Sequence, residues 1–244
     1  MKIQSVLILL NIVVLAMAKP IPAQAQWDDI FKKFKESVGL SEELSTDKII
    51  SGLKDALHVG TENAVEITSR VNGYYKNPEI RIPLPETVQK VEGILRTVGY
   101  GKQVDAFELS MNRAAEKAAP AAKSIFRDAI KKMSFTDARK ILDGADDAAT
   151  LYFKDKTYQP LYDMFKPTIS ETMGKVGVTR RYQDLAKKIQ TVPFTEGLTV
   201  DLDDYVTNGA LDGLFTMLAA EEKKIREDPA ARITPILKEV FGGK

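Results

Sequence analysis

The sequence predicts an all-α fold: one multi-helix, bundle-like domain over residues 45–244, with the option of one short two-stranded β-ribbon. Two observations predict it. Apolar or small residues recur at alternating spacings of three and four along most of the chain, which is the period of one helix face. Glycine and proline fall between these runs, where helices end and begin. No fixed repeat, low-complexity tract or long linker divides the pattern, so a single domain is expected.

Residues 1–25 have the features of a secretory signal peptide. Lys2 supplies a positive start, residues 6–17 form an apolar run, and small residues predict cleavage after Ala25, with Ala18 as the alternative. A membrane anchor is disfavoured, because the apolar run is shorter than the roughly 20 residues that span a bilayer. The absence of cysteine excludes a lipoprotein, disulfides and thiolate chemistry. We therefore expect an exported, periplasmic protein with no transmembrane segment after cleavage.

Residues 26–44 are expected to form a peripheral N-terminal helix, because "WDDIFKKF" is amphipathic. We expect its apolar side to dock on the domain. The alternative is contact with a membrane surface, which is disfavoured because the segment is short and its polar face is only weakly basic. The apolar side chains concerned are Trp27, Ile30, Phe31 and Phe34.

The first helix of the domain is expected from Asp47 to Ile67, and the breaker-rich "NGYYKNP" at residues 72–78 ends it. In the following "EIRIPLPE", isoleucine and leucine alternate with arginine and proline. This period of two predicts a short edge strand or an extended strap over residues 80–84. A strand here could pair with residues 192–200, which also have strand-like character.

Pro85 is expected to start the next helix, and Gly99 or Gly101 to end it. The alanine-rich "MNRAAEKAAPAAK" that follows keeps helical phase on both sides of Pro120, which predicts two consecutive helices or one kinked helix. Small inward side chains let a neighbouring helix approach closely. We therefore expect a tightly packed central helix pair. Its inward alanines are Ala114, Ala115 and Ala118, and the inward side of the preceding helix is expected to hold Val88, Val91, Leu95 and Val98.

Caps and breakers mark the remaining helices. Pro160 and Pro167 are expected to interrupt the helical pattern of residues 160–177. Acidic residues at the start of residues 201–228 favour the dipole of a helix there. The other starts and stops are expected at Ser134, Gly144, Asp146, Thr179 and Pro229.

Four long stretches resemble one known family. They are "NPEIRIPLPE", "ELSMNRAAEKAAPAAKSIFRDAIKKM", "DARKILDGADDAATLYF" and "EEKKIREDPAARITPILKEVFG". Together they resemble the bacterial exported proteins grouped as domain of unknown function 4197, over about residues 53–242. The resemblance implies a helical bacterial envelope protein. It implies no reaction and carries over no functional residues.

The composition excludes several classes of site. His58 is the only histidine, so neither a zinc or di-iron site nor a Ser-His-Asp relay is expected. No G-x-S-x-G or glycine-rich phosphate motif is present, and no cofactor is expected. The 35 basic and 34 acidic residues are mixed along the chain, which disfavours nucleic acid as a partner. Asp201, Asp203 and Asp204 could bind calcium, but they lack the rest of an EF-hand loop, so helix capping is favoured.

Several polar residues lie on or beside the inward helix faces. Glu221 follows Leu214 and Leu218 on one face, and a buried carboxylate needs a partner. We expect a structural polar network that fixes helix register, rather than a ligand pocket. The full candidate set is Asn112, Arg113, Glu116, Asp146, Asp147, Glu221, Arg226 and Arg232, with the three arginines as possible partners of Glu221.

Three functions fit these observations. The preferred one is a non-catalytic envelope protein that binds an apolar small molecule, a lipid or a protein partner. The second is a hydrolase using two of Glu116, Asp147 and Glu221, which would have to face each other across an open cleft about 5–10 Å apart. The third is a scaffold or oligomer in which residues 79–85, "EIRIPLP", add to a partner's sheet.

Overall fold

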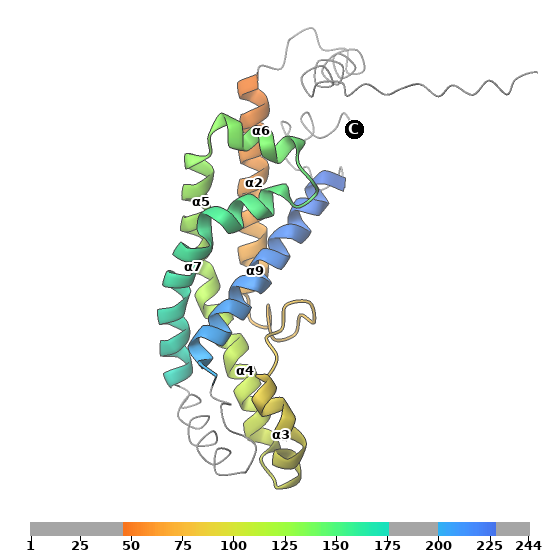
Figure 1. Cartoon of the computed structure of the whole chain (residues 1–244), viewed down its shortest axis with the longest axis vertical. Coiled ribbons are helices and arrows are strands. Elements are labelled where there is room, and N and C mark those ends of the chain that lie inside the picture. The colour runs from red at the N-terminus through yellow and green to blue at the C-terminus, as the bar shows by residue number, and fades with distance from the viewer. Residues whose placement is uncertain (1–45, 176–199, 228–244) are drawn as a thin grey trace, which may run out of the picture. The chain divides into compact units, whose positions relative to one another are not determined.

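The computed structural model describes residues 46–175 and 200–227 (Figure 1). Their elements are α2 (Thr46–Ser69), α3 (Glu86–Thr97), α4 (Gly101–Ala118), the 3-10 turn η1 (Ala119–Ala121), α5 (Ala122–Lys132), α6 (Phe135–Asp143), α7 (Ala148–Lys175) and α9 (Leu202–Glu227). No strand occurs among these residues, which confirms the all-α prediction. None of the helices described is both long and apolar enough to cross a membrane.

Helix α9 lies at the centre of the packing (Figure 1). It runs along both α2 and α7, while α7 also packs along α4. The buried residues of α9 repeat at helical spacing and include Val206, Ala210 and Leu214, each with no exposed surface. This repeat is the inward stripe that the sequence predicts, so local periodicity and tertiary packing agree in this helix.

The alanine-rich stretch is buried, as predicted. Ala114 and Ala115 have no exposed surface, and α4 packs closely on α7. Pro120 lies in η1, between α4 and α5. Its fixed φ and missing N–H suit the first turn of a new helical segment. The prediction of consecutive helices broken at this proline is therefore confirmed.

The expectation that Pro160 and Pro167 interrupt the helix is wrong. Both lie inside α7, on positions exposed to solvent. The carbonyls that lose an N–H partner to each ring therefore face water rather than the core. On the opposite side, five large residues are completely buried, and their packing holds the helix together. They are Phe153, Leu161, Phe165, Ile169 and Met173.

Helix α6 starts with a reciprocal capping box. The Ser134 hydroxyl accepts a hydrogen bond from the Asp137 N–H at 3.1 Å, and the Asp137 carboxylate accepts one from the Ser134 N–H at 3.1 Å. The Ser134 hydroxyl also donates to Asp137 Oδ2 at 2.7 Å, and this bond, followed by that from the Ser134 N–H, lowers the pKa of Asp137. Both the Ser134 cap and the stop at Gly144 agree with the sequence prediction.

The segment between α2 and α3 forms turns and then the strap, residues 80–84, without strand pairing among the described residues. Residues 192–199, proposed to pair with it, lie outside the described residues. Tyr74 in the turns is completely buried, and its hydroxyl donates to the Ala210 carbonyl at 2.6 Å. Gly213 of α9 makes room for this ring, because a Cβ there would lie 2.5 Å from Tyr74 Cε1.

Candidate functional site

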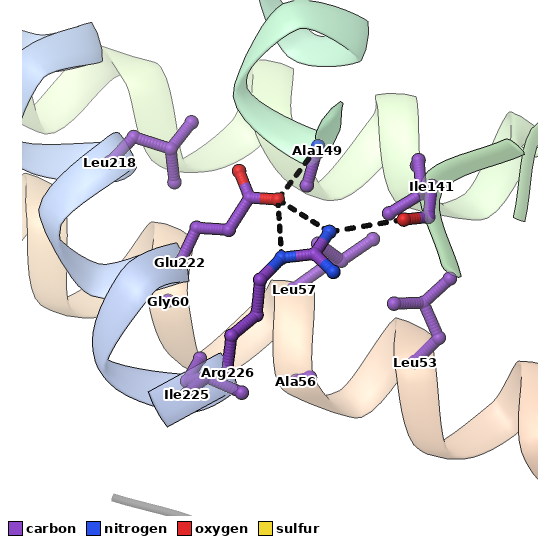
Figure 2. A pocket seen from close by; sticks show the side chains of 10 residues that line it. All are labelled: Leu53, Ala56, Leu57, Gly60, Ile141, Ala149, Leu218, Glu222, Ile225 and Arg226. Carbon is purple, nitrogen blue, oxygen red and sulfur yellow. Dashed lines mark hydrogen bonds and ion pairs between the residues drawn. The ribbon is translucent and has the colours of Figure 1, made fainter. Parts of the chain in front are cut away.

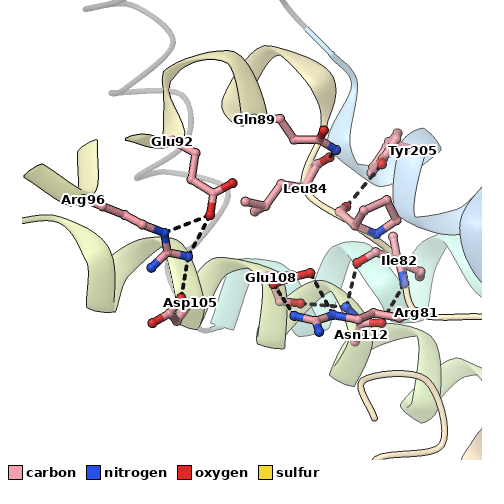
Figure 3. Close-up of polar contacts among 11 residues, drawn as sticks. Arg81, Ile82, Leu84, Gln89, Glu92, Arg96, Asp105, Glu108, Asn112 and Tyr205 are labelled. Carbon is pink, nitrogen blue, oxygen red and sulfur yellow. Dashed lines mark hydrogen bonds and ion pairs between the residues drawn. The ribbon is translucent and has the colours of Figure 1, made fainter. Parts of the chain in front are cut away.

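The strap is held against α4 by the side chain of Asn112 (Figure 3). Its Oδ1 accepts a hydrogen bond from the Ile82 N–H at 2.9 Å, and its Nδ2 donates to the Ile82 carbonyl at 2.9 Å. Nδ2 also donates to the Glu108 carbonyl at 2.9 Å. Asn112 is completely buried, as predicted. Its amide bonds both the N–H and the carbonyl of Ile82, as the backbone of a neighbouring strand would.

A surface ion pair reinforces this attachment. Arg81 donates from Nε and Nη2 to the two carboxylate oxygens of Glu108, at 2.8 and 2.6 Å. This fork raises the pKa of Arg81. The guanidinium also lies over the Tyr75 ring, 4.8 Å from its centroid. The charge of Arg81 is therefore neutralised within its own chain.

Glu116 organises the turns that follow α2. Its Oε1 accepts hydrogen bonds from the N–H groups of Tyr74 and Tyr75, at 3.2 and 3.3 Å. Its Oε2 pairs with Arg113, which also donates to Asn72 Oδ1 at 2.7 Å. The carboxylate is 4% exposed and all its partners come from the same chain. Glu116 and Arg113 thus form the kind of structural polar network that the sequence suggests.

Glu221 is buried, as predicted, but its partners are not the expected arginines. Its Oε2 accepts a hydrogen bond from Asn63 Nδ2 of α2 at 2.9 Å, and its Oε1 pairs with Lys224 one turn away. Arg113 pairs with Glu116 instead, and Arg226 pairs with Glu222. Arg232 lies outside the described residues. The amide of Asn63 reaches Glu221 because α2 and α9 pack side by side.

The neighbouring Glu222 joins α9 to α7, and the sequence analysis missed it (Figure 2). Its carboxylate accepts hydrogen bonds from the N–H groups of Ala149 and Thr150, at 2.9 and 2.8 Å. These N–H groups lie in the first turn of α7 and have no acceptor within their own helix. A negative charge at this position also complements the helix dipole. The only signal in the sequence is the spacing of four between Glu222 and Arg226, which fits a helical ion pair.

Arg226 completes this connection. It donates to Glu222 Oε1 from Nε at 3.1 Å and from Nη2 at 2.8 Å, and Nη2 also donates to the Ile141 carbonyl at 3.0 Å. That carbonyl lies at the C-terminal end of α6, where a cation is favourable. The pair therefore satisfies the end of one helix and the start of the next.

Asp146 and Asp147 require a correction, because both are exposed. They precede α7, whose N–H groups at Ala149 and Thr150 bond a carboxylate of α9 instead of the local cap expected at Asp146. At the start of α9, Asp201 Oδ1 does accept from the N–H groups of Asp203 and Asp204, at 3.0 and 3.1 Å. The prediction of capping at this second position is confirmed.

Two hollows among the described residues lie beside the polar groups described above. The first is an apolar pocket of about 30 Å³ beside Glu222 and Arg226 (Figure 2). The second is an open groove of about 370 Å³ between the strap and α9. Gly209 and Gly213 line it, together with Ile80 and Ile82. Its polar lining consists of Glu79, Arg81, Tyr205, Asn208, Asp212 and Thr216.

None of this arrangement resembles a catalytic set. Glu116 and Glu221 accept hydrogen bonds from backbone, amide or cationic groups of their own chain, and neither lines the groove. His58 is exposed, with Nε2 at 3.9 Å from Glu62. The described residues include no cluster of three metal-ligating side chains.

Comparison with known proteins gives a family but no function. No curated protein and no solved structure matches the chain significantly. The family model described as "Protein of unknown function (DUF4197)" matches residues 43–242, which is well over half of the chain. The chain therefore belongs to the DUF4197 family.

Proposed function

We propose that this protein is exported and non-catalytic, and that it binds a segment of a partner protein in the groove between the strap and α9. The groove is the observation that carries the proposal, because it is an open hollow of about 370 Å³ with both apolar and charged lining residues. The proposal of export is supported by the features of residues 1–25.

An apolar small molecule or a lipid fits less well. The apolar pocket among the described residues has a volume of about 30 Å³, which is about that of one water molecule. Ligand pockets usually measure about 300–1,000 Å³. The small side chains Ala114, Ala115 and Ala118 are buried in a helix that packs closely on α7.

The charges of the groove select a cationic partner. Glu79 and Asp212 are exposed, and neither forms a salt bridge among the described residues. The one cation in the lining, Arg81, is neutralised by Glu108. The floor is formed by the buried side chains of Ile80 and Ile82. A segment with lysine or arginine beside an apolar residue would complement this surface.

The partner does not add a strand to the strap. The N–H groups of Ile80 and Arg81 donate to the Asn77 carbonyl, at 3.2 and 2.9 Å. The Ile82 N–H donates to Asn112, and Pro83 has no N–H. Residues 80–83 therefore offer no free backbone donor to a partner strand. Recognition must use the side chains of the groove.

Charge reversal tests the proposal. An array of short peptides that combine basic and apolar residues should yield binders, and their affinity should fall about ten-fold or more in Glu79→Lys/Asp212→Lys. Peptides with acidic residues in place of the basic ones should bind that variant better than the original protein. The matched control is Asp128→Lys, an exposed change on α5 outside the groove, which should leave affinity unchanged. Equal affinity of all three proteins for the basic peptides would contradict the proposal.

Export is tested separately. The protein released from the periplasm of its host by osmotic shock should have an N-terminus at Gln26, as its intact mass would show. An unprocessed chain in the cytoplasmic fraction would contradict export, without bearing on the groove.

A further inference from the structure

The end of the α3–α4 hairpin is an apolar surface. The turn between the helices passes through Gly99, which has φ +92°, a conformation that glycine adopts without strain. Ile94, Val98 and Tyr100 surround this turn and are 66%, 60% and 51% exposed. The expected inward position of Val98 is thus wrong. Val88, near the start of α3, is buried, whereas Val98, at the C-terminal end of the helix, is exposed to solvent.

Helix α3 packs mainly against one other described helix. Its only extensive contact with another described helix is with α4, beside which it lies in Figure 1. Ile94 and Val98 are one helical turn apart, so their side chains lie on the same face of the chain. Tyr100 follows directly after the turn. We define the hairpin tip as these three residues together with the flanking Lys90 and Lys102.

The charges of the hairpin leave a basic flank. Arg96 donates to Glu92 at 2.8 Å and to Asp105 at 2.7 Å, so both acids near the tip are already paired with a cation (Figure 3). Lys90 and Lys102 are exposed, and neither forms a salt bridge among the described residues. Lys90 lies one turn before Ile94, and Lys102 lies two residues after Tyr100.

From this juxtaposition we propose that the hairpin tip contacts an anionic lipid surface. Two aliphatic side chains at the end of a helical hairpin can enter the boundary between headgroups and acyl chains. Tyrosine is favoured at that boundary, and lysine side chains extend to anionic headgroups. Three side chains around a turn are small for a protein interface, which usually buries about 800 Å² on each partner. The proposal does not depend on the groove.

Vesicle flotation tests the contact with the full-length protein. Every variant keeps residues 1–45, so only differences between variants bear on the tip. With vesicles of equal parts phosphatidylcholine and phosphatidylglycerol, Ile94→Ser/Val98→Ser should lower the partition coefficient about ten-fold or more. Lys90→Gln/Lys102→Gln should lower it for these vesicles at low salt, and should have no effect with phosphatidylcholine alone.

The matched control is Leu151→Ser/Met164→Ser, which removes two aliphatic side chains that are 57% and 50% exposed on α7. It should partition like the original protein. Equal loss in the control and tip variants, or no loss in either, would overturn the proposal. So would a dimer in light scattering that Ile94→Ser/Val98→Ser converts to a monomer, because the tip would then bind a second copy. All these side chains are exposed, so circular dichroism should show unchanged folding.

Discussion

Asn112 and Ile82 are joined by two hydrogen bonds of 2.9 Å, one from the Ile82 N–H and one to the Ile82 carbonyl. A side-chain amide thus pairs with a backbone peptide as a neighbouring strand would. The bonds place the strap on α4, and the strap in turn forms one wall of the groove. Asn112 therefore belongs to the support of the proposed binding site and does not itself line it.

Asn112→Ala should destabilise the fold. It would leave the buried N–H and carbonyl of Ile82 without partners, at a cost of about 2–4 kcal/mol. Urea unfolding followed by circular dichroism would measure the loss. Asn208→Ala, at an exposed position that bonds only the Tyr158 hydroxyl, should cost less than about 1 kcal/mol. If the two variants lost equal stability, the bonds of Asn112 to the strap would have no special importance.

Removal of the Glu222 carboxylate should be more damaging. Glu222→Ala would deprive the start of α7 of two acceptors and Arg226 of a buried counter-charge, at a cost of about 3–5 kcal/mol. Glu222→Gln keeps one acceptor oxygen and should cost less. The exposed Glu227→Ala in the same helix provides the control, with an expected change within about 0.5 kcal/mol. Thermal or urea unfolding distinguishes these outcomes, and a neutral Glu222→Ala would contradict the role of this carboxylate.

Two glycine-to-alanine changes should have opposite signs. At Gly213 the new Cβ would lie 2.5 Å from Tyr74 Cε1 and 3.1 Å from Ile80 Cβ, and this overpacking costs about 1–3 kcal/mol. Gly93 in α3 has no atom within 4 Å of the corresponding position, so Gly93→Ala should stabilise the protein by about 0.5–1 kcal/mol through helix propensity. The midpoints of urea unfolding report both signs. Stabilisation by both changes would mean that the Tyr74 ring can move away from α9.

The sequence predicts the helices well where one face is continuously apolar. The stripes of α2, α4 and α9 are buried as expected, and the break at Pro120 follows from proline geometry. The prediction fails where distant packing overrides a local rule. Proline disfavours a helix interior, yet α7 continues through Pro160 because its opposite face is completely buried.

The candidate site was only partly predictable for a similar reason. Burial of Asn112 and Glu221 follows from their helical phase, whereas the phase of Glu116 indicates the opposite face of its helix, and yet that carboxylate is buried. Their hydrogen-bond partners could not be predicted, because helical phase does not tell which group of another segment lies opposite. Glu222 caps Ala149, 73 residues earlier in the chain, and no local spacing indicates that pairing. Breaker residues around Tyr74 predicted only the end of the first helix, whereas the space at Gly213 that accommodates its ring belongs to α9.

Burial of Tyr74 should make the fold sensitive to alkali. Loss of hydration, followed by the negative charge of Glu116, raises the pKa of Tyr74 above its ordinary value of about 10. Because the folded-state pKa is the higher one, the neutral ring contributes its full stability below about pH 10. That stability is lost as the pH rises further, since the unfolded chain can release the proton and the folded one cannot.

The free energy of unfolding should therefore fall above about pH 10, with up to about 1.4 kcal/mol per pH unit due to Tyr74. Other ionisable groups also titrate there, so the slope must be compared between variants. Tyr74→Phe should lose about 1 kcal/mol at neutral pH, because the bond to the Ala210 carbonyl disappears, but its alkaline slope should be shallower. Tyr100→Phe, at a 51% exposed position, should keep the original slope. Urea unfolding between neutral and alkaline pH measures all three. Parallel slopes for the Tyr74→Phe variant and the original protein would mean that the Tyr74 hydroxyl can ionise within the fold, which its burial against Glu116 should prevent.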